Sequence, residues 1–274
     1  MSQVHDWPLL GVDFTSAPQR AKAITAAFGR IDGDQLVLQR IERLADWPAF
    51  EALLQRQGPW LGAFDFPFGL PREAVLALGW PPQWAAMVRH CAALGRPAFR
   101  AALDAWRCTR PAGQRYAHRA TDLPARSHSP LKLVNPPVGL MFLEGAPRLL
   151  AAGVHLPGIH AGDPERIAVE AYPGLLARRL GAGSYKSDEG RKQTAAREAM
   201  RARIVAALQA GAAHPCPALR ADEALVQALI AEGSADGLDA VLALCQAAAC
   251  ALHGPPHYGL APGFDGLEGW IAGA

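Results

Sequence analysis

The order of extended and helical patterns in residues 9–71 limits the possible folds more than any other feature of the chain. Three stretches typical of strands are joined by short turns, which predicts antiparallel pairing between neighbours. A helical stretch that begins at Asp46 and ends at Gly58 then leads to a fourth apolar stretch. Because this helix can carry a crossover, we expect the fourth strand to run parallel to the first in a mixed sheet. The expected strands span residues 9–15, 21–31, 36–44 and 60–71.

The pattern changes between residues 72 and 165. Helical fragments such as 83–95 and 97–107 alternate there with proline-rich connectors, without strand alternation. Residues 166–174 return to a strand pattern, and two or three helices complete the chain. We therefore predict one α/β domain over residues 1–274. It has a five-stranded mixed sheet flanked by helices, with a helical insertion at 72–165 between strands four and five.

The composition is that of a globular protein, since half of the 274 residues are apolar and 19% are charged. The net charge of +2 argues against a generally basic nucleic-acid-binding protein but leaves room for a local basic patch. The N-terminal residues lack the pattern of a signal peptide, and no apolar run reaches the roughly 18 residues of a membrane span. Five scattered cysteines suit reduced thiols better than a disulfide framework. We therefore expect a cytoplasmic protein without a membrane segment.

Acidic residues stand at the ends of the predicted elements. Asp13 and Asp65 lie near the carboxyl ends of two predicted strands, where ligands of sheets with parallel strands usually bind. Glu170 lies near the end of the fifth strand, and Asp236 and Asp239 share one face at the start of a helix. Converging carboxylates repel each other unless a cation neutralises them, and an oxygen-rich site favours Mg²⁺ or Mn²⁺. This set therefore predicts a divalent-metal site.

Most of these acids also have an ordinary structural interpretation. Asp13 and Asp65 could each belong to a turn, and Asp236 could be the N-cap of the last long helix. Glu170 could pair with an arginine of the insertion. Asp239 lies within a mostly apolar helix, where an unused carboxylate is costly, so a functional role is favoured for this residue.

Several short motifs occur together over nearly the whole chain. The main ones are GVDFTSAP at 11–18, FDFPFGLP at 64–71, VEAYPG at 169–174 and GLDAVLALCQAA at 237–248. Three more are R-x-T-D at 119–122, NPPVG at 135–139 and SYKSD at 184–188. Together these motifs resemble a family of predicted nucleases with a ribonuclease H-like fold, catalogued as domain of unknown function 429.

The resemblance implies a ribonuclease H-like core whose first strand carries Asp13, whose fourth strand carries Asp65 and whose late helix carries a third acid. The sequence DGLDA at 236–240 also resembles the D-x-x-D-A signature of Holliday-junction resolvases, which share that fold. By this resemblance Asp239 would bind the metal. Unlike ribonuclease H itself, the chain has no obvious partner acid on its first helix, and Glu170 is our candidate for the missing carboxylate.

The insertion contributes basic residues with aromatic residues among them. Such a run could hold a phosphate backbone and stack bases, and the alternative is a solvated helical face with tryptophans in the core. The basic residues are Arg96, Arg100, Arg107, Arg110, Arg115, Arg119, Arg126 and Lys132, and the aromatic ones are Trp80, Trp84, Trp106 and Tyr116. Across the whole chain, our candidates for substrate binding are Thr15, Ser16, Arg119, Asp122, Lys132 and Lys186.

We therefore expect a divalent-metal-dependent nuclease in which Asp13, Asp65 and Asp239 hold Mg²⁺ or Mn²⁺ while water attacks a phosphodiester. Its substrate would be DNA or RNA, or a smaller phosphate ester. One alternative is an ATP-dependent phosphotransferase of the actin and sugar-kinase type. Such enzymes have a D-x-G-T phosphate loop, and the sequence DFTS at 13–16 is similar to it. Such an enzyme needs a second half, for which the chain is short. Another alternative is a non-catalytic binding protein that kept the fold.

Overall fold

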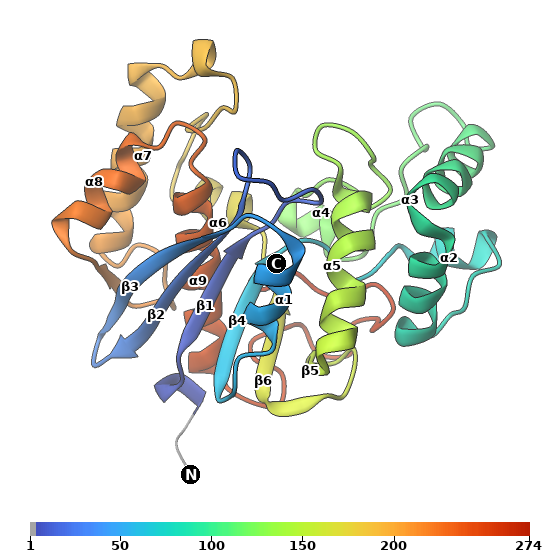
Figure 1. The fold of residues 1–274 in the computed structure, drawn as a ribbon, viewed down its shortest axis with the longest axis horizontal. Coiled ribbons are helices and arrows are strands. Elements are labelled where there is room, and N and C mark those ends of the chain that lie inside the picture. The colour runs from blue at the N-terminus through green and yellow to red at the C-terminus, as the bar shows by residue number, and fades with distance from the viewer. Residues whose placement is uncertain (1–3) are drawn as a thin grey trace.

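A seven-stranded sheet lies at the centre of the protein, for which a computed structural model describes residues 4–274 (Figure 1). The strands are β1 (Leu9–Asp13), β2 (Ile24–Asp32), β3 (Gln35–Leu44), β4 (Trp60–Asp65), β5 (Val154–His155), β6 (Asp163–Glu170) and β7 (Ala218–Arg220). Their order in the sheet is β5-β6-β4-β1-β2-β3-β7. β1 and β3 pair antiparallel with β2, whereas β4 pairs parallel with β1 and β6. The prediction of a mixed α/β sheet is confirmed.

The number of strands differs from the five that the sequence predicts. The two additional strands lie at the edges, where β5 pairs with β6 and β7 pairs with β3. β5 has two residues and β7 has three, so neither is long enough to show a period-two alternation. Since β5 falls between residues 72 and 165, the segment predicted as a helical insertion is not purely helical.

Helices cover both faces of the sheet (Figure 1). They are α1 (Trp47–Leu54), α2 (Arg72–Ala77), α3 (Trp84–Cys108), α4 (Asp122–Ala125), α5 (Val138–Ala152), α6 (Pro173–Arg179), α7 (Ala195–Gln209), α8 (Glu223–Ala231) and α9 (Asp236–His253). Two short 3₁₀ helices span Val4–Asp6 and Gly190–Lys192. As predicted, Asp46 caps α1, because its carboxylate accepts a hydrogen bond from the Ala49 N–H at 2.9 Å.

The side chains of β1 alternate between two hydrophobic cores. Leu10 and Val12 pack on the face covered by α1, α3 and α5. Leu9 packs on the opposite face, with residues of α7 and α9. Because Asp13 follows Leu9 and Gly11 at a spacing of two, its side chain lies on the α9 face of the sheet.

Gly11 allows α9 to lie unusually close to β1. A Cβ atom at this position would be 2.1 Å from the Leu244 nitrogen and 2.2 Å from the Ala240 carbonyl oxygen. Only glycine fits there without displacing the helix. Since Asp239 directly precedes Ala240, this close contact brings the first turn of α9 to the carboxyl end of β1.

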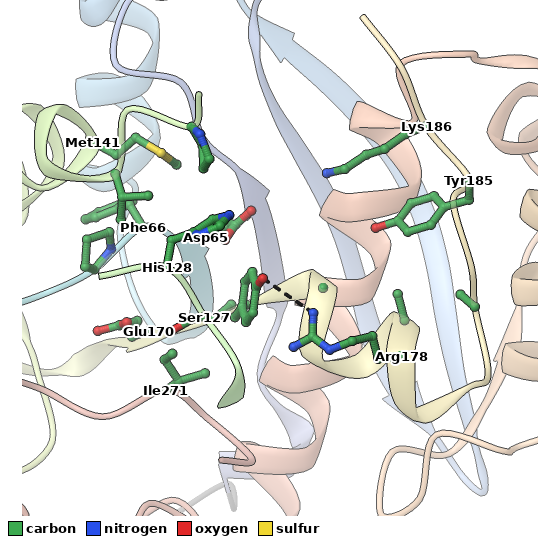
Figure 2. Close-up of a pocket in the computed structure, with 18 of the residues that line it drawn as sticks. Asp65, Phe66, Ser127, His128, Met141, Glu170, Arg178, Tyr185, Lys186 and Ile271 are labelled. Atoms are coloured by element: carbon green, nitrogen blue, oxygen red, sulfur yellow. Dashed lines mark hydrogen bonds between the residues drawn. The ribbon is translucent and has the colours of Figure 1, made fainter. Parts of the chain in front are cut away.

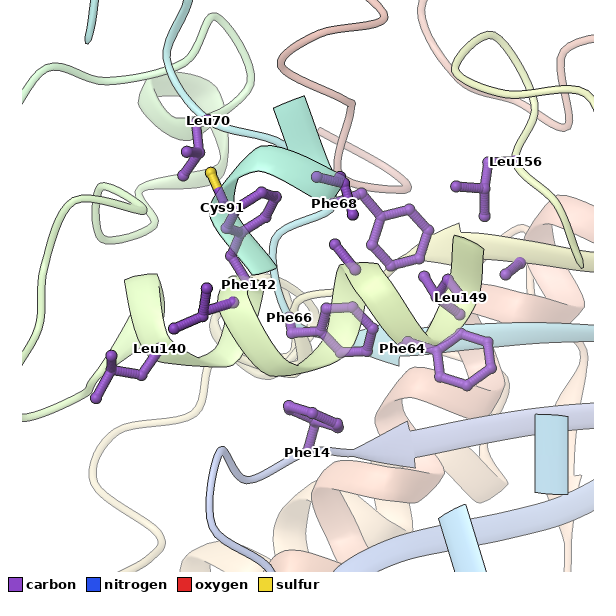
Figure 3. Close-up of a cluster of buried hydrophobic side chains, with 14 of the residues drawn as sticks. Phe14, Phe64, Phe66, Phe68, Leu70, Cys91, Leu140, Phe142, Leu149 and Leu156 are labelled. Carbon is purple, nitrogen blue, oxygen red and sulfur yellow. The ribbon is translucent and has the colours of Figure 1, made fainter. Parts of the chain in front are cut away.

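The segment from residue 72 to residue 165 shares its core with the sheet. Figure 3 shows Phe14, Phe64, Phe66 and Phe68 packed beside Phe142 of α5. The rings of Phe14 and Phe66 are 4.5 Å apart between centroids, which joins the loop after β1 to the loop after β4. Three tryptophans of the predicted basic and aromatic run are also buried in this core, as the structural alternative predicted; they are Trp80, Trp84 and Trp106.

No single helix within residues 4–274 is long and apolar enough to cross a membrane. The pair α8 and α9, bent by 119° at the break between them, reaches such a length and composition only when the two are taken together. In this structure α9 packs against the sheet and is almost entirely buried.

Candidate functional site

Two carboxylates meet at the carboxyl ends of β1 and β4. Asp13 is the last residue of β1 and Asp65 is the last residue of β4, and the parallel register makes the two direct neighbours. Both line a cavity of about 440 Å³, here called the acidic cavity, together with Lys22, Lys186 and Asp236. The structure thus brings Asp13 and Asp65 together, as the sequence predicts.

Neither of these carboxylates has a direct partner that neutralises it. Among residues 4–274, no group forms a hydrogen bond or an ion pair with the carboxylate of Asp13 or of Asp65. Burial, and then repulsion by Asp239 and Asp65, raises the pKa of Asp13 well above its ordinary value. Burial also raises the pKa of Asp65 to about 7, against the opposing charge of Lys186. Lys186 is thus the nearby positive charge of this pair, and it offsets only part of the effect of burial.

Asp239 in the first turn of α9 is the third acid of the predicted site, and its side chain is buried. The Tyr185 hydroxyl donates a hydrogen bond to Asp239 Oδ1 at 2.6 Å. The Lys186 ammonium donates to Oδ2. Burial and the nearby Asp239 charge raise the pKa of Tyr185, so this phenol is a protonated donor. Both oxygens of Asp239 are thus already bonded within the protein.

Lys186 places a positive charge beside the buried acids. Its side chain is 48% exposed, whereas the Asp239 side chain that it contacts is only 1% exposed. Burial alone would lower the pKa of Lys186, but the charges of Asp239 and Asp13 outweigh it and hold this pKa well above its ordinary value. The next residue is fixed, because the Ser187 N–H donates to the Gly233 carbonyl at 3.0 Å. Lys186 is therefore a charged ammonium held at the edge of the acidic cavity.

Asp236 forms a second pair with a lysine. Lys22 Nζ lies 2.9 Å from Asp236 Oδ1, and Asp236 is buried at the first residue of α9. The N-cap of the helix is Ala235, so the interpretation of Asp236 as the N-cap is wrong. Instead, Glu232 Oε2 accepts a hydrogen bond from the Gly237 N–H at 2.7 Å. The acidic start of α9 is thus covered by two lysines from separate loops.

Glu170 is bound by Arg119. The two Nη atoms of Arg119 donate to the two oxygens of Glu170 at 2.8 Å and 2.7 Å, and the Phe68 N–H adds a third hydrogen bond at 2.8 Å. Burial raises the pKa of Glu170, and the Arg119 charge opposes this shift. The alternative that Glu170 pairs with an arginine of the insertion is confirmed. Since both of its oxygens are used, we do not retain Glu170 as a metal ligand.

Arg119 and Asp122, which the sequence assigns to substrate binding, are buried instead. Arg119 is 2% exposed and Asp122 is 1% exposed, and their side chains are 2.9 Å apart. Arg119 also donates to the Glu268 carbonyl at 3.0 Å. Together with the Glu170 contact, this network joins the insertion, the end of β6 and the C-terminal segment. This network has a structural role, and Arg119 and Glu170 also line the second cavity described below.

The remaining substrate-binding candidates lie in different places. Thr15 and Ser16 line the acidic cavity, next to Asp13. The Ser16 carbonyl is already bonded, since Arg96 donates to it at 2.6 Å. Lys132 lines neither the acidic cavity nor the second cavity described below.

The basic run of the insertion is not an open positive surface. Four of its eight members form ion pairs with acids of the same chain. The pairs are Arg96–Glu144, Arg107–Asp104, Arg110–Glu73 and Arg119–Asp122. About half of the charge that would attract a phosphate backbone is therefore neutralised internally.

A second cavity, of about 500 Å³, adjoins the acidic cavity. Four residues line both cavities, namely Asp65, Pro136, Met141 and Lys186. Figure 2 shows Asp65 and Met141 on one side of it, with Tyr185 and Lys186 on the other. We call it the apolar cavity, because most of its lining is apolar or aromatic. Further lining residues are Phe66, Ser127, His128, Val138, Tyr172 and Ala182.

The carboxylates can be compared with the ligands that a divalent cation requires. Within residues 4–274, no three His, Cys, Asp or Glu side chains are placed so that together they could hold a metal ion. Asp13 and Asp65 still provide two free carboxylates, and Mg²⁺ is often bound by one or two carboxylates, with water and substrate phosphate as its other ligands. Two free carboxylates are thus what this site offers to such a cation.

Two residues of the site, Tyr185 and Lys22, carry no sequence pattern that reveals their contacts. The SYKSD motif marks the loop that carries Tyr185, but no pattern shows that its hydroxyl meets Asp239, a contact across 54 positions. Lys22 precedes the β2–β3 hairpin and carries no signal, because its contact with Asp236 spans 214 positions. Both contacts depend on tertiary packing.

Comparison with known proteins identifies a family without a known activity. No curated protein and no solved structure matches the chain significantly. A family model described as "Protein of unknown function (DUF429)" matches residues 11–256, which is most of the chain. This match agrees with the motifs found in the sequence. The chain therefore belongs to the DUF429 family of proteins of unknown function.

Proposed function

We propose that the protein is a divalent-metal-dependent hydrolase of phosphodiester bonds in nucleic acid. The proposal is carried by the pair of Asp13 and Asp65, two neighbouring carboxylates that face a cavity and have no direct partner among residues 4–274. Such a pair is costly unless it takes up a proton or a cation. A role in turns would not account for this cost, because neither carboxylate bonds to a backbone group among residues 4–274.

Asp13 and Asp65 would hold Mg²⁺ or Mn²⁺ in the acidic cavity. When bound, such an ion polarises a phosphoryl oxygen and activates water for in-line attack. Asp239 would become a third ligand only after Lys186 releases its Oδ2. Thr15, which also lines the acidic cavity, offers a hydroxyl that can donate a hydrogen bond to a substrate oxygen.

Lys186 and Lys22 supply the positive charge that an anionic substrate needs. Each lysine contacts an aspartate of α9 and lines the acidic cavity. A phosphate that enters the cavity offers the same kind of oxygen acceptor, so Lys186 would exchange Asp239 for the phosphate. This exchange would leave the Asp239 carboxylate free to face the other two acids.

We further infer that the core is ribonuclease H-like, as the family resemblance implies. The support is the placement of the acids: Asp13 ends β1, Asp65 ends β4 and Asp239 lies on the late helix α9. These are the positions that the resemblance assigns to them. The close contact of α9 with Gly11 explains how a late helix can bring its acid to the end of the first strand.

We also infer a cytoplasmic location. All five cysteines are free thiols in the structure, and four of them are buried. Reduced thiols are typical of the cytoplasm, whereas secreted proteins commonly pair them.

The proposal is tested by incubating the protein with single-stranded, duplex and branched DNA and RNA, in Mg²⁺, in Mn²⁺ and in EDTA. We expect cleavage that requires the metal and is lost in Asp13→Asn and Asp65→Asn. Asp34→Asn, in the exposed β2–β3 turn, is the matched control and should cleave normally. Cleavage in EDTA, or full activity of Asp13→Asn, would contradict the proposal. Transfer of phosphate from ATP to a small hydroxylated acceptor would favour the phosphotransferase alternative.

A further inference from the structure

We propose that the apolar cavity binds a single nucleobase, so that the protein recognises one nucleotide, with its base in the apolar cavity and its phosphate in the acidic cavity. The phosphate half of this assignment rests on the proposed function. The base half rests on the cavity itself. Its volume of about 500 Å³ falls within the range typical of small-molecule sites.

The two cavities share a wall that suits a ligand with two chemically different parts. Asp65 and Lys186 belong to both, so an anionic group bound at Lys186 would lie at the entrance of the apolar cavity. An uncharged group attached to that anion would then enter between Met141 and Tyr185, which face each other in Figure 2. A nucleotide joins such parts through its sugar.

The lining of the apolar cavity includes phenylalanine and tyrosine rings, among which Tyr172 is the least buried. Phe66, Tyr172 and Tyr185 contribute rings to its lining. The Tyr185 ring is fixed through the bond from its hydroxyl to Asp239, and the Arg178 guanidinium lies 5.2 Å from the centre of the Tyr172 ring. Aromatic side chains that are held in place form the stacking surfaces of nucleotide pockets.

Polar groups at the rim can read the edge of a base. The Ser127 hydroxyl donates to Asp122 Oδ1 at 2.8 Å, which leaves its oxygen as an acceptor. Burial and the nearby charge of Lys132 lower the pKa of His128, so its imidazole is neutral at pH 7 and offers one donor and one acceptor. Purine and pyrimidine edges carry donors and acceptors of the same kind.

The charge distribution favours one nucleotide over an extended strand. A strand needs a continuous positive track along its backbone. Half of the basic run in the insertion is neutralised by internal ion pairs, so it offers no continuous track. Lys22 and Lys186 are paired with Asp236 and Asp239, but both line the acidic cavity, where a phosphate can reach them. A free nucleotide or a strand end would meet both cavities, whereas a base inside a duplex would first have to leave its stack.

The experiment measures binding rather than cleavage, so the metal site and the base site are tested separately. Metal-free protein in EDTA is titrated calorimetrically with the four ribonucleoside 5′-monophosphates and with ribose 5-phosphate, which lacks a base. Val138→Trp, at the start of α5, and Ala182→Phe, in the loop after α6, fill the apolar cavity from two different segments. Val134→Trp is the control, because Val134 is 58% exposed and lines neither cavity. Thermal melts establish that each variant is folded.

We expect at least one monophosphate to bind at least about tenfold more tightly than ribose 5-phosphate. The two filling variants should weaken that binding by about tenfold or more, while Val134→Trp leaves it unchanged. Equal binding of ribose 5-phosphate, no binding of any monophosphate, or unchanged binding in both folded filling variants would overturn the proposal. If one of the two filling variants does not fold, the binding measured with the other variant tests the proposal. If binding depends on the base but no nucleic acid is cleaved, the result would support the nucleotide pocket and contradict the proposed hydrolase activity.

Discussion

Lys186 and Asp239 form an ion pair in which a half-exposed ammonium covers an almost fully buried carboxylate. The same ammonium is the positive charge that opposes the raised pKa values of Asp13 and Asp65. In the protein without metal, Lys186 therefore balances part of the charge of three acids. We propose that a divalent cation and a substrate phosphate divide this role between them when they bind.

Replacing Lys186 with methionine should destabilise the metal-free protein. The loss in free energy of unfolding is expected to be about 1–2 kcal/mol, less than for a fully buried pair, because solvent screens a half-exposed lysine. Urea denaturation in EDTA measures it. Lys192→Met, which removes a pair with the half-exposed Glu189, should change stability little. Equal stability of Lys186→Met and the wild type would show that the ammonium does not balance the acids.

The stability of the metal-free protein should fall as the pH rises. The folded-state pKa of Asp65 is about 7, raised from 3.8 chiefly by burial. Between these values the native state holds a proton that the unfolded chain has released, so stability is lost as the pH approaches 7. Asp13, whose pKa is also raised, adds to the effect. Melting temperatures in EDTA between about pH 5 and pH 8 should therefore decrease, and less steeply in Asp65→Asn.

The matched control for this pH series is Asp34→Asn, which should follow the wild type. Mn²⁺ should raise the melting temperature most at the higher pH, where it no longer competes with protons. A melting temperature of the wild type in EDTA that does not change with pH, or an unaltered pH dependence in Asp65→Asn, would show that burial does not raise the pKa of these carboxylates.

The variant Glu170→Gln tests whether Glu170 has a structural role or binds the metal. The amide that replaces the carboxylate would keep the shape of the side chain but weaken the bonds to Arg119, so we expect a loss of about 1–3 kcal/mol in the free energy of unfolding. The affinity for Mn²⁺ should stay close to that of the wild type. Loss of Mn²⁺ binding in a folded Glu170→Gln protein would instead restore Glu170 as a ligand.

Gly11→Ala tests how α9 is positioned. The added methyl group would overlap the backbone of α9 at Leu244 and Ala240, which should cost about 1–3 kcal/mol of stability or more. The displaced helix would also move Asp239, so metal affinity should fall as well. Gly190→Ala serves as the control, since a Cβ there meets no atom within 4 Å. If Gly11→Ala were as stable as the wild type, α9 could move away from β1 without cost, and the close contact at Gly11 would not position the helix.

Much of the sheet could be predicted because its longer strands carry local signals. β1, β2, β3 and β4 overlap the stretches that apolar runs and turn residues predicted, although β1 and β4 end earlier than predicted, at Asp13 and Asp65. The crossover through α1 predicted the parallel pairing of β1 with β4. That pairing was enough to place Asp13 beside Asp65. The edge strands β5 and β7 were missed, because two or three residues carry no periodicity.

The partners of the polar side chains could not be predicted in the same way. Nothing near Arg119 shows that its guanidinium reaches Glu170, 51 positions later, and is buried. The interleaved basic and aromatic residues fit a nucleic-acid surface and a buried core equally well by sequence. Packing separates the two cases, since the tryptophans face the core and half of the basic residues find acidic partners.

Calorimetric titration of the metal-free protein with Mn²⁺ shows whether Asp13 and Asp65 bind a divalent cation. The wild type, Asp34→Asn and Glu170→Gln should bind Mn²⁺ with similar affinity, and Lys186→Met should bind it more tightly because a repelling charge is gone. Asp13→Asn and Asp65→Asn should lose that binding while still folded. Failure of the wild type to bind Mn²⁺, or undiminished binding in Asp13→Asn, would contradict a metal site at the ends of β1 and β4.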